Sequence, residues 1–231
     1  MPETGNEELI SAAGLEKVYK RGNEEVTALR SVDLTVKKGE FVVVLGPSGS
    51  GKSTLLHLLG GIDQPTRGQL KVNGIDLTTA NETQLTRFRR DNIGFVFQFY
   101  NLLPSINALD NVILPLLANG SGWKGAREKG RVALARLGLS HREKHTPWQL
   151  SGGEQQRVAI ARAMVHEPCV ILADEPTGDL DTENAASIIS LMKELNRSQG
   201  ITVIVATHNP AFLDAATTAY ELVDGRIKSL G

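Results

Sequence analysis

Residues 41–53 read FVVVLGPSGSGKS, an unbroken apolar run that passes directly into a loop of glycine and serine. Five consecutive apolar residues are typical of a strand that is buried on both faces of a parallel sheet. The loop fits the pattern G-x-x-x-x-G-K-[ST], whose backbone N–H groups point inward at phosphate oxygens. A helical pattern follows, and its N-terminus adds a positive dipole end. The stretch therefore predicts strand, phosphate-binding loop and helix, which indicates a nucleoside triphosphatase or a kinase.

Each residue type in this loop suits a role in binding a nucleotide. Lys52 is expected to place a compact charge between the β- and γ-phosphates, and Ser53 to offer its hydroxyl to Mg²⁺. A flexible turn that matches the pattern by chance is the alternative, but the flanking strand and helix argue against it. The predicted nucleotide-binding residues of the loop are Gly46, Pro47, Ser48, Gly49, Ser50, Gly51, Lys52, Ser53 and Thr54.

Strand-like runs and helical patterns alternate along most of the chain. Strands are predicted at residues 32–36, 41–45, 69–72, 93–98, 169–173 and 201–206, with hairpin turns at 73–74 and 224–225. Helices are predicted at residues 52–60, 81–92, 127–137, 154–165 and 185–195. We interpret residues 101–165 as a helical insertion in an α/β body.

The composition favours one substantial core and gives no sign of a nucleic-acid partner. The 231 residues are 41% hydrophobic with a net charge of -1, so there is no overall basic field. The single cysteine, Cys169, excludes an intrachain disulfide and suits a reducing cytoplasm. No run approaches the ~18 apolar residues needed to span a bilayer, and no secretory signal is recognisable. We expect no direct membrane insertion, so any membrane role would come through a partner.

Asp174 and Glu175 follow a short apolar run, residues 170–173. Ligands gather at the carboxyl ends of strands in doubly wound sheets, so both carboxylates are expected near the phosphates. Asp174 is placed to hold Mg²⁺ through water, and Glu175 to polarise the attacking water. A helix cap or a solvated strand end is the alternative.

A second anion-binding pattern, LSGGEQ at residues 150–155, precedes another predicted helix. Two glycines and a serine at a helix N-terminus offer free N–H groups to an anion. A second phosphate site would be redundant unless it served the nucleotide of another molecule. The pattern suggests a head-to-tail pair of subunits with ATP between them, and a simple capped helix is the alternative.

With these motifs together, the chain resembles the ATP-binding subunits of ABC transporters over residues 9–227. The resemblance implies the fold class: α/β, with a P-loop NTPase (RecA-like) core, an antiparallel β subdomain and an inserted α-helical subdomain. It also implies one ABC ATP-binding domain over residues 1–231. In that division, residues 1–100 and 166–231 form the core and the β subdomain, and about 101–165 form the helical signature subdomain.

The resemblance also assigns roles to individual residues. Tyr19 matches the aromatic residue that stacks on adenine, with a strand-edge aromatic as the alternative. Gln98 matches the glutamine that contacts Mg²⁺ and links the core to the helical region. His208 matches the switch histidine near the γ-phosphate, and it completes a predicted catalytic set with Glu175, Lys52 and Gln98.

Two further motifs are implied to meet the nucleotide of the opposite subunit. Ser151 and Gly153 match residues that touch its γ-phosphate, and Gly152 and Glu154 belong to the same predicted site. Asp181 matches the acidic residue of a loop that crosses the interface, although the sequence here is GDLD and not the commoner SALD.

Loop sequences narrow the resemblance to one branch of the family. FVFQFYNLLP at residues 95–104 and ALDNV at residues 108–112 are similar to the lipoprotein-release and macrolide-efflux branch. In that branch a coupling element of a separate permease docks in a groove of the helical region. The candidates to line the groove, with core packing as the alternative, are Phe99, Leu102, Leu103 and Ile106. For Trp123 and Trp148 we expect packing, although Trp148 could also lie near the dimer interface.

The predicted function is that of an ATP-binding subunit that drives a separate transmembrane permease. Two copies are expected to form a homodimer on ATP binding, to use ATP and Mg²⁺, and to power export of lipoproteins, peptides or drugs. The expected location is the cytoplasmic face of the inner membrane, as a peripheral subunit. Two rivals are a soluble ABC ATPase that acts on ribosomes or DNA, and an ATP-switched regulator of an envelope or division complex without net transport.

Overall fold

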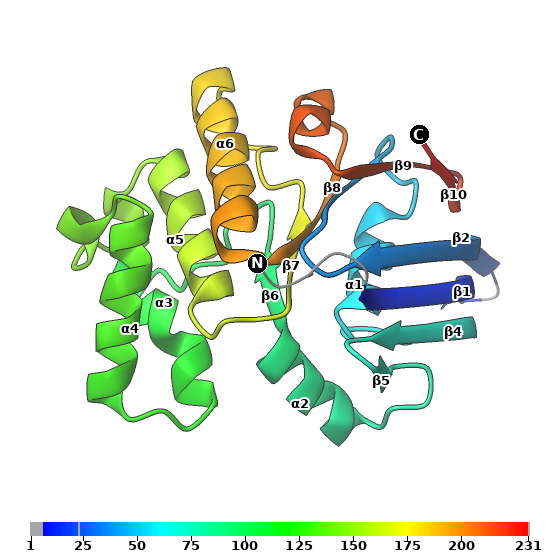
Figure 1. The fold of residues 1–231 in the computed structure, drawn as a ribbon, viewed down its shortest axis with the longest axis horizontal. Coiled ribbons are helices and arrows are strands. Elements are labelled where there is room, and N and C mark those ends of the chain that lie inside the picture. The colour runs from blue at the N-terminus through cyan, green and yellow to red at the C-terminus, as the bar shows by residue number, and fades with distance from the viewer. Residues whose placement is uncertain (1–6, 23, 231) are drawn as a thin grey trace.

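The computed structural model describes residues 7–22 and 24–230, which form two sheets with helices around them. The larger sheet has the strand order β10-β9-β3-β8-β7-β6, and all of its strands except β10 run parallel. The smaller sheet is antiparallel, with the order β2-β1-β4-β5. In Figure 1 the smaller sheet lies at one end of the molecule, and α3, α4 and α5 lie at the other.

The elements have the following bounds. The strands are β1 (Glu8–Arg21), β2 (Glu24–Lys37), β3 (Phe41–Leu45), β4 (Arg67–Val72), β5 (Ile75–Asp76), β6 (Ile93–Val96), β7 (Val170–Asp174), β8 (Thr202–Thr207), β9 (Thr218–Val223) and β10 (Arg226–Ser229). The α-helices are α1 (Lys52–Leu59), α2 (Glu82–Asn92), α3 (Ala108–Ala118), α4 (Trp123–Arg136), α5 (Gly152–Met164) and α6 (Thr182–Gln199). The 3₁₀ segments are η1 (Ser140–Arg142), η2 (Pro147–Gln149) and η3 (Pro210–Ala215).

The apolar run in β3 is buried on both faces, as the sequence predicts. Phe41 and Val43 belong to one apolar cluster with α3, α4, α5 and α6. Val42 and Val44 belong to a second cluster with α1, α2 and the antiparallel sheet. Because side chains alternate along a strand, β3 joins the two clusters and fixes the start of the phosphate loop between them.

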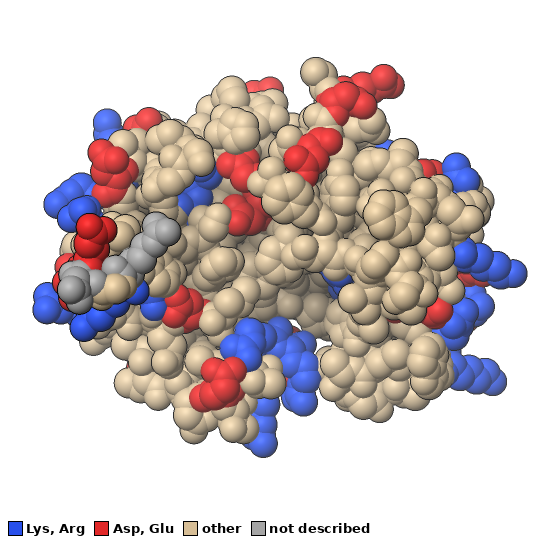
Figure 2. Space-filling model, turned by 180° about the vertical axis from the view of Figure 1, so that it is seen from behind, with Lys and Arg blue, Asp and Glu red and all other residues tan. Residues whose placement is uncertain are grey.

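Helices α3, α4 and α5 pack on one another and form a unit that we call the helical lobe. The lobe is inserted between β6 and β7, which are neighbours in the parallel sheet. A cavity of about 430 Å³, the interlobe cleft, is lined by residues of α2, β6, α3 and α5, among them Arg89, Phe95, Pro115 and Arg162. Figure 2 shows Lys and Arg side chains gathered over α2 at the edge of this hollow.

The structure confirms the predicted α/β body with inserted helices and corrects several details. The strand predicted at 93–98 ends at Val96, so Gln98 lies in the turn that follows. Helix α3 and strand β1 were not predicted, and α4 begins at Trp123 and not at residue 127. The packing expected for the tryptophans is wrong, since Trp123 is 59% exposed and Trp148 is 84% exposed.

Candidate nucleotide site

The predicted phosphate loop connects β3 to α1 at the carboxyl end of the parallel sheet. Gly51 has a φ of 105°, and a Cβ there would lie 2.5 Å from the carbonyl oxygen of Ala28. A Cβ at Gly46 would collide with the carbonyl oxygen of Leu222. Glycine is therefore required at both ends of the loop, where the neighbouring backbone approaches closely. The buried hydroxyl of Ser50, inside the loop, has no hydrogen-bond partner among the residues that the structure describes.

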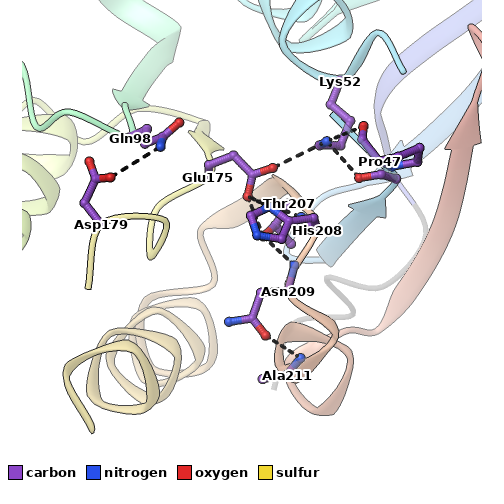
Figure 3. A network of polar contacts seen from close by, with 10 residues as sticks. Pro47, Lys52, Gln98, Glu175, Asp179, Thr207, His208, Asn209 and Ala211 are labelled. Carbon is purple, nitrogen blue, oxygen red and sulfur yellow. Dashed lines mark hydrogen bonds and ion pairs between the residues drawn. The ribbon is translucent and has the colours of Figure 1, made fainter. Parts of the chain in front are cut away.

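Lys52 folds back over the loop. Its Nζ donates to the carbonyl oxygens of Gly46 at 2.9 Å and Pro47 at 3.0 Å, and lies 3.4 Å from Oε1 of Glu175 (Figure 3). The side chain is only 7% exposed, so these oxygens are its main electrostatic partners. Phosphate oxygens could replace them without moving the ammonium group far.

Glu175 follows β7 directly and has a φ of 45°, an uncommon value for a residue with a side chain. Its Oε2 accepts hydrogen bonds from Thr207 Oγ1 at 2.9 Å and from the His208 N–H at 3.2 Å, and lies 3.0 Å from His208 Nδ1. Burial would raise the pKa of Glu175, but the hydrogen bonds from His208 and Thr207 outweigh it and hold the pKa below its usual value. The group is thus a carboxylate at neutral pH, ready to accept a proton or orient water.

Asp174 and Ser53 form a place where a hard cation fits. The Oδ1 atom of Asp174 is buried and has no hydrogen-bond partner in the described part of the chain. Burial raises the pKa of Asp174, while a hydrogen bond from Ser53 opposes the rise. An uncompensated carboxylate oxygen beside a hydroxyl is a suitable donor set for Mg²⁺, which typically takes one or two protein carboxylates plus phosphate oxygens. Among the described residues no larger cluster of acidic, His or Cys ligands exists.

Gln98 lies against the loop that follows Glu175. Its Nε2 donates to Oδ1 of Asp179 at 3.5 Å, and a Cβ at Gly178 would lie 3.1 Å from the same nitrogen (Figure 3). The predicted glutamine therefore connects the turn after β6 with the loop between β7 and α6.

Tyr19 lies on β1, 38% exposed, and is held by two neighbours. Its hydroxyl donates to Oδ2 of Asp63 at 2.9 Å, and Nζ of Lys17 lies 4.9 Å from the ring centroid. Lys17 also donates to Oδ1 of Asp63 at 2.6 Å. The ring is therefore fixed as a platform on which a base could stack.

The LSGGEQ motif forms the start of α5. Ser151 is the N-cap and accepts from the Glu154 N–H at 3.3 Å, while Oε2 of Glu154 accepts from the Ser151 N–H at 2.8 Å. The motif therefore does form a capped helix start, which was the alternative to an anion site. The N–H groups of Gly152 and Gly153 nevertheless have no hydrogen-bond acceptor among the described residues. Gly153 packs closely on α6, because a Cβ there would lie 2.6 Å from Oδ1 of Asn184.

Asp181 is the N-cap of α6, and its carboxylate accepts hydrogen bonds from the backbone N–H and the side-chain amide of Asn184. These hydrogen bonds lower the pKa of Asp181. Within the described ranges, no hydrogen bond or ion pair joins residues 150–154 or Asp181 to the phosphate loop. The predicted site residues therefore form two groups. One lies at the carboxyl end of the parallel sheet, and the other lies where the helical lobe meets α6.

Sequence reasoning missed three residues that hold predicted ones in place. Lys17 lies two residues before Tyr19 on the same face of β1, so period-2 spacing could have found it. Thr207 directly precedes His208 at the end of β8. Asp63 carries no comparable signal, because only the fold brings it to Tyr19.

The sequence and the fold of this chain are similar to those of known ATP-binding proteins of ABC transporters. A family model described as ABC transporter matches residues 29–178. The lipoprotein-releasing system ATP-binding protein LolD of Alcanivorax borkumensis is 46% identical over 96% of this chain and 97% of its own length. The dimeric ATP-binding cassette MJ0796, solved in a post-hydrolysis state with ADP and Pi, is 41% identical with a TM-score of 0.88 over 96% of this chain and 99% of that one. The structure of cbiO1 from Clostridium perfringens, part of the ABC transporter complex cbiONQ, is 28% identical with a TM-score of 0.86 and covers 96% of this chain and 88% of that one.

Proposed function

Because the chain belongs to the ABC transporter ATP-binding proteins and is an ATPase, we propose that it powers a separate transmembrane permease as a head-to-tail homodimer. The similarity to LolD, the ATP-binding protein of a lipoprotein-releasing system, supports lipoproteins as the cargo and export as the direction of transport. The protein would act at the cytoplasmic face as a peripheral subunit. Within residues 7–22 and 24–230, no helix is long and apolar enough to cross a membrane.

The placement of Glu175 is the observation that carries this proposal. Its carboxylate lies 3.4 Å from Lys52 and 3.0 Å from His208, at the carboxyl end of the parallel sheet and beside the phosphate loop. In the proposed mechanism Lys52 leaves Glu175 to bind the γ-phosphate, which frees the carboxylate to orient water for in-line attack. His208 holds the carboxylate in place from the other side.

The remaining groups bind and orient the nucleotide. Tyr19 would stack on adenine, and the N–H groups of residues 46–54 would surround the phosphates. Ser53, Asp174 and Gln98 would hold Mg²⁺, which when bound supplies charge neutralisation at the β- and γ-phosphate oxygens.

The second copy would complete the site. The free N–H groups of Gly152 and Gly153, with the hydroxyl of Ser151, form an anion site that no phosphate of the same chain is placed to use. In a head-to-tail pair they would contact the γ-phosphate bound by the opposite copy, and Asp181 would lie at the same interface. ATP would then hold the closed dimer, and hydrolysis would release it.

The interlobe cleft is the proposed docking site for the permease. Phe99 and Leu103, at 71% and 48% exposure, argue against the core-packing alternative for this segment. Leu102 is partly buried against the lobe. An apolar coupling element bound there would contact the turn that carries Gln98 and would sense the state of the nucleotide site.

Replacing Glu175 with Gln tests the proposal. We expect Glu175→Gln to bind Mg-ATP, to lose turnover by about 10²-fold or more and to accumulate as a dimer with ATP. Glu194→Gln, on the exposed face of α6, is the matched control and should hydrolyse normally. Light scattering and ATPase assays give the result, and an ATP-loaded variant that stays monomeric or turns over normally would contradict the assignment.

Reconstitution with a membrane protein that co-purifies with this chain distinguishes transport from the alternative of an ATP-switched regulator. ATP-dependent release of a lipoprotein from proteoliposomes is expected with the wild-type protein and not with the Glu175→Gln variant. ATP-driven dimerisation without any release would favour the regulator.

A further inference from the structure

Trp148 has the most exposed large apolar side chain in the described part of the protein, at 84%. An indole combines a large apolar surface with one N–H donor, and tryptophan is enriched at interfaces, where both can be used. Exposed tryptophans are among the residues that most often dominate the energy of an interface.

The backbone beneath Trp148 is rigid. Thr146 and Gln149 form a capping box around η2, with Oε1 of Gln149 accepting from the Thr146 N–H at 2.9 Å. Pro147 is buried, and its carbonyl accepts from the N–H of Leu150 at 3.1 Å. The side chain of Leu150 is itself buried in the core of the lobe. The indole is thus presented on a fixed support, so that burying it would cost little backbone entropy.

The same support continues into the LSGGEQ motif. Ser151 directly follows Leu150, and a second capping box joins it to Glu154. Arg142 fixes the carboxylate of Glu154 at 2.8 Å. Two consecutive capping boxes therefore place Trp148 and Ser151 on one stiff segment, three residues apart.

We propose that Trp148 packs against the second copy of this chain when two copies close over ATP, as an apolar anchor at the rim of the nucleotide interface. The inference rests on the proposed head-to-tail dimer and adds a contact outside the LSGGEQ motif. Continuity with Ser151 favours a second copy as the occupant. The permease is the other possible occupant, but the interlobe cleft proposed for it is lined by other residues.

The chain contains only two tryptophans, which permits a direct spectroscopic test. In a Glu175→Gln, Trp123→Phe protein, Trp148 is the only tryptophan. Adding Mg-ATP should shift its emission to the blue and protect it from acrylamide quenching, with the same dependence on protein concentration as dimer formation by light scattering. In the matched Glu175→Gln, Trp148→Phe protein, the emission of Trp123 should stay unchanged.

The affinity of the ATP-dependent dimer should also depend on Trp148. Trp148→Ala in the Glu175→Gln background should weaken the ATP-dependent dimer about tenfold or more, whereas Trp123→Ala should not. The thermal unfolding midpoint and the affinity of the monomer for ATP should be unchanged in both variants, because both indoles are exposed.

The outcomes are distinguishable. A dimer that forms while Trp148 stays exposed to quencher overturns the inference and leaves the proposed function intact. The absence of any ATP-dependent dimer overturns both. Protection of Trp148 that appears only with the membrane partner, and not on dimer formation, also overturns the inference, because the permease would then be the occupant.

Discussion

At the scale of single residues, two adjacent carboxylates have opposite environments. Burial raises the pKa of Asp174, and its Oδ1 has no hydrogen-bond partner within residues 7–22 and 24–230. The pKa of Glu175 is lowered in spite of burial, because His208 and Thr207 donate to the charged form. Asp174 is the last residue of β7, whereas Glu175 leaves the strand with a φ of 45°, so the two neighbours reach different surroundings. This separation suits a cation ligand beside a carboxylate that orients water.

Asp174→Asn is expected to stabilise the nucleotide-free protein at pH 7. A carboxyl group whose pKa is raised by folding costs stability whenever it is ionised, and the cost disappears below the unfolded value of about 3.9. The variant should therefore unfold at a higher temperature at pH 7 in the presence of EDTA, and the gain should shrink toward pH 4. Asp91→Asn, at a carboxylate whose pKa is lowered by Arg90, should show no such gain. An unchanged or lower unfolding temperature for Asp174→Asn at pH 7 would show that the ionised carboxylate does not destabilise the fold. Whatever the effect on stability, the variant should lose Mg-dependent ATP hydrolysis.

Asp63→Ala is expected to weaken ATP binding without changing the chemical step. The carboxylate holds both the hydroxyl of Tyr19 and the ammonium of Lys17, and its loss frees the ring. The KM for ATP should rise about threefold to tenfold with kcat nearly unchanged, since a platform under adenine binds ground state and transition state alike. Glu25→Ala removes the exposed Lys20–Glu25 pair between β1 and β2 and should leave KM unchanged. If the two variants behave alike in steady-state kinetics, Asp63 does not position Tyr19.

At the scale of elements, the sequence predicted the parts whose pattern is local. The apolar run of β3, the loop glycines and the Asn73–Gly74 hairpin were readable because each depends on a few neighbouring residues. Helix α3 was missed because Pro115 lies inside it, and Asn107 at its N-cap was not recognised as a start signal. Strand β1 was missed because register shifts along its pairing with β2 interrupt the alternation. The position of Asp63 depends on tertiary contacts, so no local pattern could have shown it.

Ser151 caps α5 and is also proposed to contact the nucleotide of the opposite copy. A comparison with Asn107, which only caps α3, distinguishes these two roles. Ser151→Ala removes the N-cap bond of α5, and Asn107→Ala removes the N-cap bond of α3. Each loss should lower the free energy of unfolding by about 1 kcal/mol. Only Ser151→Ala should also lower turnover, with ATP binding by the monomer intact, because Asn107 does not contact the nucleotide in the proposed dimer. Chemical denaturation and ATPase assays measure both effects, and equal loss of turnover in the two variants would show that capping alone matters.

At the scale of the whole molecule, the helical lobe shares an apolar core with the parallel sheet, and polar contacts also connect it to the turn that carries Gln98. Gln98 contacts Asp179 on the loop that follows Glu175. The guanidinium of Arg162 on α5 donates to the carbonyl oxygens of Tyr100 and Asn101, whose φ values of 56° and 47° form a left-handed turn. The turn after Gln98 is therefore bound to the lobe, so a displacement at the phosphates would move both together. ATP can shift such a movement only through its different affinity for the open and closed states.

The exposed ring of Phe99 is the expected contact through which this movement reaches the permease. Phe99→Ala removes the exposed ring of the turn between Phe97 and Asn101, two residues that line the interlobe cleft. If the ring is a central contact, capture of a membrane protein that co-purifies with the chain should weaken about tenfold or more. Leu213→Ala, which truncates a 39% exposed side chain on η3, is the matched control. Basal ATPase activity and ATP-dependent dimerisation should be unchanged in both variants, since neither side chain contacts the phosphate loop. Full capture by Phe99→Ala, or equal loss in both variants, would place the permease elsewhere. Selective loss would show that the turn that carries Gln98 also contacts the membrane partner, and it would connect the proposed hydrolysis site to transport through a few residues.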